Sequence, residues 1–178
     1  LLFSIGERPS GVLRLDWRHY DGEFLTFPKV KDRNKAGRIV PLIEPAIEAL
    51  EAWRCESVRI RPEDPIFGHD GGGRMGHTWF RKRFYHMMKT LELPENDAWG
   101  GRRVPYSFKY TLETELLDRG ANPALVRDLM GHSHQRGEME TTLTPVQARY
   151  RRRKRAESLR SLLPLIVGIV EGKKDPTG

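Results

Sequence analysis

Apolar side chains recur at helical spacing along most of this chain, which predicts a mainly helical fold. The helical stretches carry ordinary end signals, such as Pro45 in a first turn, Asn122 as an N-terminal cap, and Gly120 and Gly131 as stops. We predict helices that begin at Glu44, at His77, after Pro105 and at Asn122. A last basic helix is predicted over about residues 146–170, interrupted or kinked at Pro164. In the helix from His77, six residues are expected to face the core: Trp79, Phe80, Phe84, Met87, Met88 and Leu91.

A different pattern lies near the start of the chain. Residues 24–27 and 38–42 are short runs rich in apolar and β-branched residues, and they flank a polar stretch, so they predict two strands of a hairpin. The fold class is therefore α+β, mainly α-helical, with one small antiparallel sheet near the N-terminus. Residues 1–170 are expected to form one domain and residues 171–178 a flexible tail.

Composition narrows the class of protein. The chain has 178 residues, of which 38% are hydrophobic and 31% charged, as in ordinary soluble domains. Its one cysteine, Cys55, excludes an internal disulfide and suits a reducing compartment, so a cytoplasmic location is expected. The most apolar stretch, Ser161 to Val170, is too short to span a bilayer. We expect no membrane partner.

The charge points to a polyanionic partner. The formal net charge is +7 and the isoelectric point about 9.7, which favours nucleic acid first and an anionic membrane second. A basic helical domain that binds RNA or membrane remains an alternative at this point. The chain opens on Leu-Leu-Phe without a methionine, and we expect a fragment that has lost its N-terminal part.

The sequence contains no motif for a nucleotide or a metal. It has no phosphate-binding Gly-Lys-Ser/Thr loop, no Gly-x-Gly-x-x-Gly, and no histidine at zinc-like spacing from Cys, Asp or Glu. We expect no cofactor and no metal. What remains is a set of cations at the ends of elements: Arg8, the hairpin residues Lys29, Lys31 and Arg33, Lys109, and His132. Several such donors could converge on one phosphate, or each could cap a turn or be solvated.

Four blocks of sequence resemble, in order and spacing, the catalytic domain of the tyrosine recombinases, also called phage integrases. The blocks are IGERPSGVLRLDW, KVKDRNKAGRIVPL, YSFKYTLETELLDRG and NPALVRDLMGHS. The resemblance runs from Ile5 to about Leu163 and implies that Arg8 is the first catalytic arginine and His132 the second histidine of the family. It also implies a catalytic lysine in the hairpin. Lys31 fits best, and Lys29 and Arg33 stay open.

The departures from the family pattern concern the same site. Tyr106 stands where the family has histidine, Lys109 where it has its second arginine, and Gly11 where it has a buried glutamate. Lys109 keeps the charge but lacks the fork that grips two phosphate oxygens. Tyr106 can donate a hydrogen bond, but a phenol is a poor base at neutral pH.

The position of the nucleophile also departs from the family. Counting from His132 leads to Thr141 or Pro145, neither of which can attack as a tyrosine would, and Tyr150 is the one tyrosine that follows. Tyr150 is either the nucleophile or a residue that packs at a helix start. The basic residues beside it are expected to contact DNA phosphates rather than form a solvated face: Arg149, Arg151, Arg152, Arg153 and Lys154.

The resemblance implies site-specific recombination or integration of double-stranded DNA through a 3′-phosphotyrosyl intermediate, without metal or ATP. Arg8, Lys109 and His132 would hold the nonbridging oxygens, Lys31 would protonate the leaving hydroxyl, Tyr106 would act as base or donor, and Tyr150 would attack. The alternative is a degenerate relative that binds DNA without cutting it. The family also implies a separate N-terminal clamping domain and a tetramer on DNA.

Overall fold

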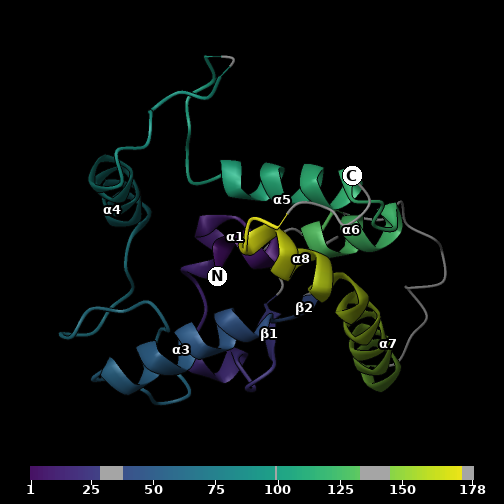
Figure 1. The fold of residues 1–178 in the computed structure, drawn as a ribbon. Helices are drawn as coiled ribbons and strands as arrows, with labels where there is room; N and C mark the ends of the chain where they lie inside the picture. Colours follow the sequence, from purple (N-terminus) through teal and green to yellow (C-terminus); the bar gives the residue numbers. More distant parts are fainter. Residues whose placement is uncertain (29–37, 99, 133–144, 174–178) are drawn as a thin grey trace.

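The computed structural model describes residues 1–28, 38–98, 100–132 and 145–173, and it is mainly helical with a two-stranded sheet (Figure 1). The first half of the chain contains α1 (Leu2–Ile5), α2 (Pro9–Val12), the 3-10 helix η1 (Trp17–His19), β1 (Phe24–Phe27), β2 (Arg38–Pro41), α3 (Glu44–Glu56) and α4 (His77–Thr90). The second half contains α5 (Ser107–Asp118), α6 (Pro123–Met130), α7 (Pro145–Ser158), the 3-10 helix η3 (Leu159–Leu162) and α8 (Leu163–Val170). The α+β, mainly helical class is confirmed.

The predicted hairpin strands are present. β1 and β2 pair antiparallel in a register that places Phe24 opposite Pro41 and Phe27 opposite Arg38. Along β1 only Thr26 is exposed, so the apolar face of the strand turns inward, as the alternation of side chains in a strand requires. The polar segment between the strands, which includes Lys29, Lys31 and Arg33, lies outside the described residues.

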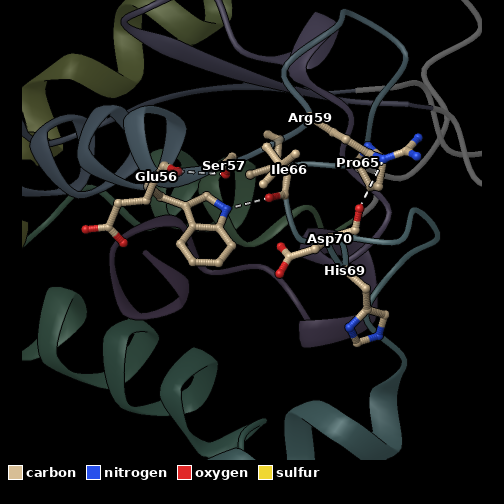
Figure 2. A pocket seen from close by; sticks show the side chains of 10 residues that line it. Glu56, Ser57, Arg59, Pro65, Ile66, His69 and Asp70 are labelled. Carbon is tan, nitrogen blue, oxygen red and sulfur yellow. Dashed lines mark hydrogen bonds between the residues drawn. The ribbon is translucent and has the colours of Figure 1, made fainter.

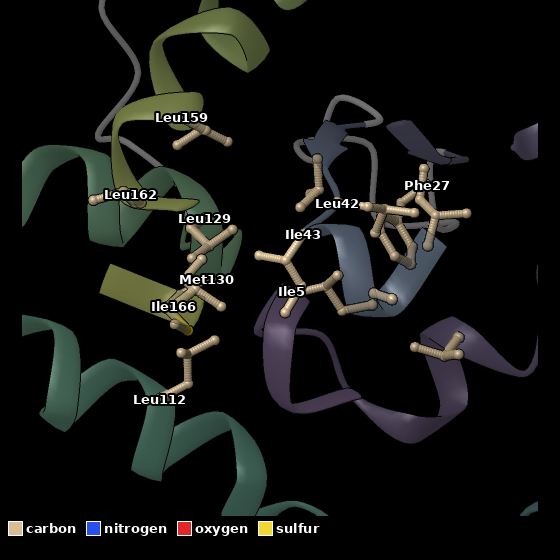
Figure 3. Packing of buried hydrophobic residues seen from close by; sticks show 14 of the residues in the cluster. Ile5, Phe27, Leu42, Ile43, Leu112, Leu129, Met130, Leu159, Leu162 and Ile166 are labelled. Carbon is tan, nitrogen blue, oxygen red and sulfur yellow. The ribbon is translucent and has the colours of Figure 1, made fainter. Parts of the chain in front are cut away.

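One hydrophobic core joins the sheet to the helices. Ile5 from α1, Leu112 from α5, Met130 from α6 and Ile166 from α8 are each at most 1% exposed and belong to the same cluster as Leu42 (Figure 3). Burial of each such side chain is worth about 1.5–3 kcal/mol. The core therefore fixes the start of the chain, which carries Arg8, against α5 and α6, which carry Lys109 and lead to His132.

The helix ends follow the sequence signals. The Asn122 side chain accepts a hydrogen bond from the backbone N–H of Ala124 at 2.9 Å, and α6 ends at Gly131 in the left-handed conformation. The last helix is interrupted, as predicted, but the break comes earlier than Pro164: η3 separates α7 from α8, and Pro164 lies in the first turn of α8. The predicted tail, residues 171–178, lies largely outside the described residues.

The prediction for the apolar face of α4 was wrong for two of its six residues, Met87 and Leu91, while Trp79 and Phe80 are half-buried. Phe84 and Met88 are buried, whereas Met87 is 41% and Leu91 59% exposed. The reason is that α4 lies apart from α5, α6 and α8 (Figure 1) and contacts α5 through Phe84, whose ring meets that of Phe108 edge-on at 5.7 Å. Within the described ranges, no helix is both long and apolar enough to cross a membrane.

Candidate active site

Arg8 directly precedes α2, and its side chain is exposed to solvent. Its backbone is extended, because Pro9 begins the helix and Arg8 acts as the N-cap residue. The guanidinium carbon lies 5.5 Å from the centre of the Tyr106 ring, in a cation–π contact that links the first block of sequence to the start of α5. Among the described residues, Arg8 is exposed and its side chain forms no ion pair. Arg8 can therefore receive an anion from outside.

The start of α5 supplies a row of polar side chains. Tyr106, Lys109, Tyr110 and Glu113 are spaced by three or four residues, which places them on neighbouring positions of the helix surface. The rings of Tyr106 and Tyr110 meet edge-on at 4.8 Å. The hydrogen bond between the two phenols raises the pKa of Tyr110, and the charge of Tyr106 acts in the same direction. Tyr110 itself is 58% exposed.

Lys109 turns inward. It is only 4% exposed, and its Nζ donates a hydrogen bond to the carbonyl oxygen of Met130 at 2.5 Å. Burial lowers the pKa of Lys109 to about 8, the charge of Arg38 acts in the same direction, and Glu7 opposes the shift. Lys109 thus holds α5 to the end of α6, and it would have to leave the Met130 carbonyl in order to contact a phosphate.

His132 follows the last turn of α6. Its backbone N–H donates to the carbonyl of Arg127 at 3.1 Å, which fixes the residue just after the left-handed Gly131. Its Nδ1 lies 3.5 Å from Oε1 of Glu113 on α5, and the imidazole is 47% exposed. Glu113 therefore orients His132 toward the same helix that carries Tyr106 and Lys109.

Arg38 is a central residue of this region that the sequence patterns did not single out. Its Nη2 donates to Oε2 of Glu7 at 2.6 Å, and its guanidinium lies 5.0 Å from the centre of the Phe27 ring. A side chain at Gly131 would come within 3.2 Å of the Arg38 Nε, so the glycine serves both the turn and this close packing. Arg38 thereby joins Glu7, next to Arg8, to the turn that precedes His132.

These contacts bring four of the expected residues into one cluster: Arg8, Tyr106, Lys109 and His132. Comparison with known sequences places the chain in a family. The sequence model of the Phage integrase family matches residues 1–139, most of the chain. The chain belongs to the phage integrase family.

Curated integrase relatives support the assignment. The chain is 28% identical over 135 residues to the tyrosine recombinase XerC of Rhizobium meliloti, which covers 75% of this chain and 40% of that protein. It is 30% identical over 158 residues to XerD of Mycobacterium leprae, covering 83% and 47%. A probable integrase/recombinase of Methanocaldococcus jannaschii is 27% identical over 170 residues, covering 93% and 48%. The chain thus spans less than half the length of these relatives.

Solved structures of integrases show the same fold. The XerA recombinase aligns with a TM-score of 0.61 at 16% identity, covering 86% of this chain and 54% of that one. The Tn1549 transposon integrase, in complex with circular intermediate DNA, aligns with a TM-score of 0.60 at 18% identity, covering 86% and 57%. The prediction of a tyrosine-recombinase-like catalytic fold is therefore confirmed.

Two expected residues of the integrase site are not brought to the cluster by any described contact. Lys31 lies outside the described residues, as do the alternatives Lys29 and Arg33. Tyr150 is in α7 and 68% exposed, and the structure gives it no hydrogen bond or ring contact within the described part of the chain. It also lies beyond the end of the family match at residue 139.

Among the described residues, the basic side chains of α7 differ in whether they form ion pairs or are exposed without one. Arg153 lies 3.1 Å from Asp21 and 3.4 Å from Glu157, and its guanidinium covers the Phe24 ring at 3.9 Å, so it braces α7 against the sheet. Arg151 and Lys154 are exposed and Arg152 is half-buried, while the side chain of Arg149 lies outside the described part of the chain. Arg151 and Lys154 are thus the members best placed to meet an external phosphate.

A second cationic surface lies on α4, and the sequence patterns did not reveal it. Arg81, Lys82, Tyr85 and Arg102 line an open hollow of about 380 Å³, and the Arg102 guanidinium lies 5.1 Å from the centre of the Tyr85 ring. The available signal was the helix sequence HTWFRKRFYHMMKT, which contains four Lys or Arg residues and no acid.

A second hollow lies where two segments of the chain are held together by a hydrogen bond. It measures about 40 Å³ between the end of α3 and the following loop (Figure 2). Two of its polar side chains are bonded to the backbone: the Trp53 Nε1 donates to the Ile66 carbonyl at 2.6 Å, and Ser57 Oγ donates to the Trp53 carbonyl at 2.7 Å. None of the expected site residues lines it. In the described residues, no group of three or more His, Cys, Asp or Glu is arranged to hold a metal.

Proposed function

We propose that this integrase-family domain breaks and rejoins double-stranded DNA at specific sites through a 3′-phosphotyrosyl intermediate. The observation that carries the proposal is the exposed Arg8 guanidinium, held beside Tyr106 in one cluster with Lys109 and His132. Cationic donors fixed around one position stabilise the charge that builds on a phosphoryl group in the transition state. The names of relatives such as XerC and XerD support the same reaction class.

The proposed chemistry needs one attack and one proton transfer. A tyrosine Oη forms a bond to the scissile phosphorus, the bond from phosphorus to the 5′ oxygen breaks, and the 5′ oxygen takes a proton. Tyr150 is the proposed nucleophile and Lys31 the proposed proton donor. The phenol proton passes to a base, a role that we propose for His132, whose Nδ1 lies 3.5 Å from Oε1 of Glu113. A second 5′-hydroxyl reverses the step, so the energy of the phosphodiester is kept.

Two observations fit a second candidate function. Lys109 is buried and bonded to the Met130 carbonyl, and Tyr150 has no described contact with the cluster. A domain in that state would bind DNA phosphates without cutting them. Both candidates act on duplex DNA, and in both the whole protein is proposed to self-associate on DNA, as a tetramer in the cytoplasm.

A suicide substrate separates the two candidates. We expect the protein to form a covalent adduct with a nicked DNA duplex, from which the short 5′-hydroxyl fragment diffuses away and so prevents rejoining. Mass spectrometry of the adduct identifies the attacking tyrosine, which we expect to be Tyr150 rather than the cluster residues Tyr106 and Tyr110. A retarded DNA band without any adduct would support binding alone, and no binding would reject both.

The α4 hollow is proposed as an additional contact to the DNA backbone. Replacing Arg81, Lys82 and Arg102 by alanine should reduce the slope of log affinity against log salt by about 0.9 for each phosphate that the variant no longer binds. Arg59→Ala is the matched control, because Arg59 is exposed and its Nε donates to the Asp70 carbonyl at 3.4 Å in the other hollow. Filter-binding titrations over a range of salt measure both slopes. An unchanged slope in the triple variant would place these residues away from DNA.

A further inference from the structure

The acidic neighbour of Arg8 is turned away from the arginine side chain. Glu7 Oε1 accepts a hydrogen bond from the backbone N–H of Arg8 at 2.7 Å, and its Oε2 accepts one from Arg38 Nη2 at 2.6 Å. Both carboxylate oxygens are thus engaged, and the Glu7 side chain is only 19% exposed. An exposed arginine that follows a glutamate would otherwise have an anion within reach of its own guanidinium.

The space that holds the Glu7 carboxylate exists because residue 11 is glycine. A Cβ added to Gly11 would lie 2.8 Å from Glu7 Cγ and Cδ and 2.9 Å from Oε1. These distances are shorter than any ordinary carbon contact, so a side chain at position 11 would displace the carboxylate. Gly11 is within α2, where alanine suits the backbone at least as well, so the requirement for glycine comes from Glu7.

Arg38 holds the carboxylate from the other side and is itself fixed. Its guanidinium lies against the Phe27 ring, and its Nε would be 3.2 Å from a Cβ at Gly131. The Arg38 side chain is only 16% exposed, and its Nη1 is buried without a hydrogen-bond partner among the described residues. A buried guanidinium in this position requires the Glu7 charge, and so it retains that carboxylate strongly.

We propose that Glu7, Gly11 and Arg38 act together to keep the Glu7 carboxylate off the Arg8 guanidinium, which leaves Arg8 free to bind a DNA phosphate. Gly11 and Arg38 are then the residues that position the Glu7 carboxylate, and they act on Arg8 only through it. The inference rests on the proposed function for the identity of the anion, whereas the arrangement of the charges stands on the geometry alone.

Gly11→Ala tests the inference. We expect the methyl group to push Glu7 outward, where it pairs with Arg8 and weakens binding of duplex DNA by about threefold to tenfold, in line with an ion pair at an exposed site. The double variant Gly11→Ala/Glu7→Gln should recover most of that affinity, because the amide cannot neutralise Arg8. Gly71→Ala is the matched control, since a Cβ there meets nothing within 4 Å. A weakened affinity that Glu7→Gln does not restore would overturn the proposal.

A second measurement requires no DNA. Arg8→Ala shifts the urea midpoint of unfolding, and this shift is measured once with Glu and once with Gln at position 7. With Gly at position 11, the two shifts should be equal. With Ala at position 11, they should differ, because Glu7 then pairs with Arg8. Should Gly11→Ala fail to fold, Arg38→Gln releases Glu7 instead and should show the same dependence. Coupling of Glu7 to Arg8 already present in the wild type would contradict the inference. If the wild-type protein binds no duplex DNA, the proposed function is rejected. The urea measurement of coupling between residues 7 and 8 still tests the inference about Glu7 in that case.

Discussion

An Arg8→Ala variant is expected to form the covalent adduct about 10²–10³-fold more slowly than the wild type, which is the usual cost of removing one preorganised donor from a charged transition state. Its affinity for duplex DNA should fall much less, because exposed cations elsewhere, such as Arg81 and Lys82 on α4, are proposed to hold the backbone. Single-turnover adduct formation on the nicked duplex and gel-shift titration measure the two quantities separately.

Arg14→Ala serves as the control for Arg8→Ala. Arg14 is exposed in the segment that follows α2, so its removal changes the net charge equally without touching the cluster. Arg8→Lys should recover little of the cleavage rate, because an ammonium lacks the planar fork that binds two phosphate oxygens. Cleavage by Arg8→Ala at the wild-type rate would show that the cluster around Tyr106 is not the place where the phosphate reacts.

Local signals in the sequence were sufficient for much of the fold. The cap at Asn122, the stop at Gly131 and the strands predicted over 24–27 and 38–42 each depend on a few neighbouring residues. The structure confirms them, with the second strand ending at Pro41. The exposure of Met87 and Leu91 on α4 could not be predicted this way, because helical spacing of apolar residues does not tell how much partner surface the rest of the chain supplies.

The environment of the site depends on contacts between distant segments. The sequence shows a lysine at position 109, but its burial follows from the approach of the Met130 carbonyl, which only the packing of α6 on α5 determines. The pairing of Glu7 with Arg38 likewise joins the start of α2 to β2. Gly11 departs from the family pattern in the sequence, yet its role is visible only in the structure, where the Glu7 carboxylate lies beside it.

Lys109 gives the second large expected effect, which is on stability. The structure lowers its pKa from the ordinary 10.5 to about 8 through burial and the charge of Arg38, with smaller effects of Glu7, Arg8 and Glu113. Between pH 8 and pH 10 the folded protein has therefore released this proton while the unfolded chain still holds it. Unfolding then takes up a proton, so the free energy of unfolding should rise with pH across this window.

We expect the rise to be about 2 kcal/mol after allowance for solvent screening, and we expect it to be missing in Lys109→Met. Urea unfolding at intervals from pH 7 to pH 10 measures it in both proteins. The measurements stop at pH 10 because of Tyr20. Burial raises the pKa of Tyr20 to about 12, so above pH 10 the unfolded chain loses this proton before the folded protein does, and the free energy of unfolding falls. Equal pH dependence in the two proteins would mean that Lys109 keeps its proton on folding, and its ammonium would then be available to a phosphate as a full positive charge throughout the range.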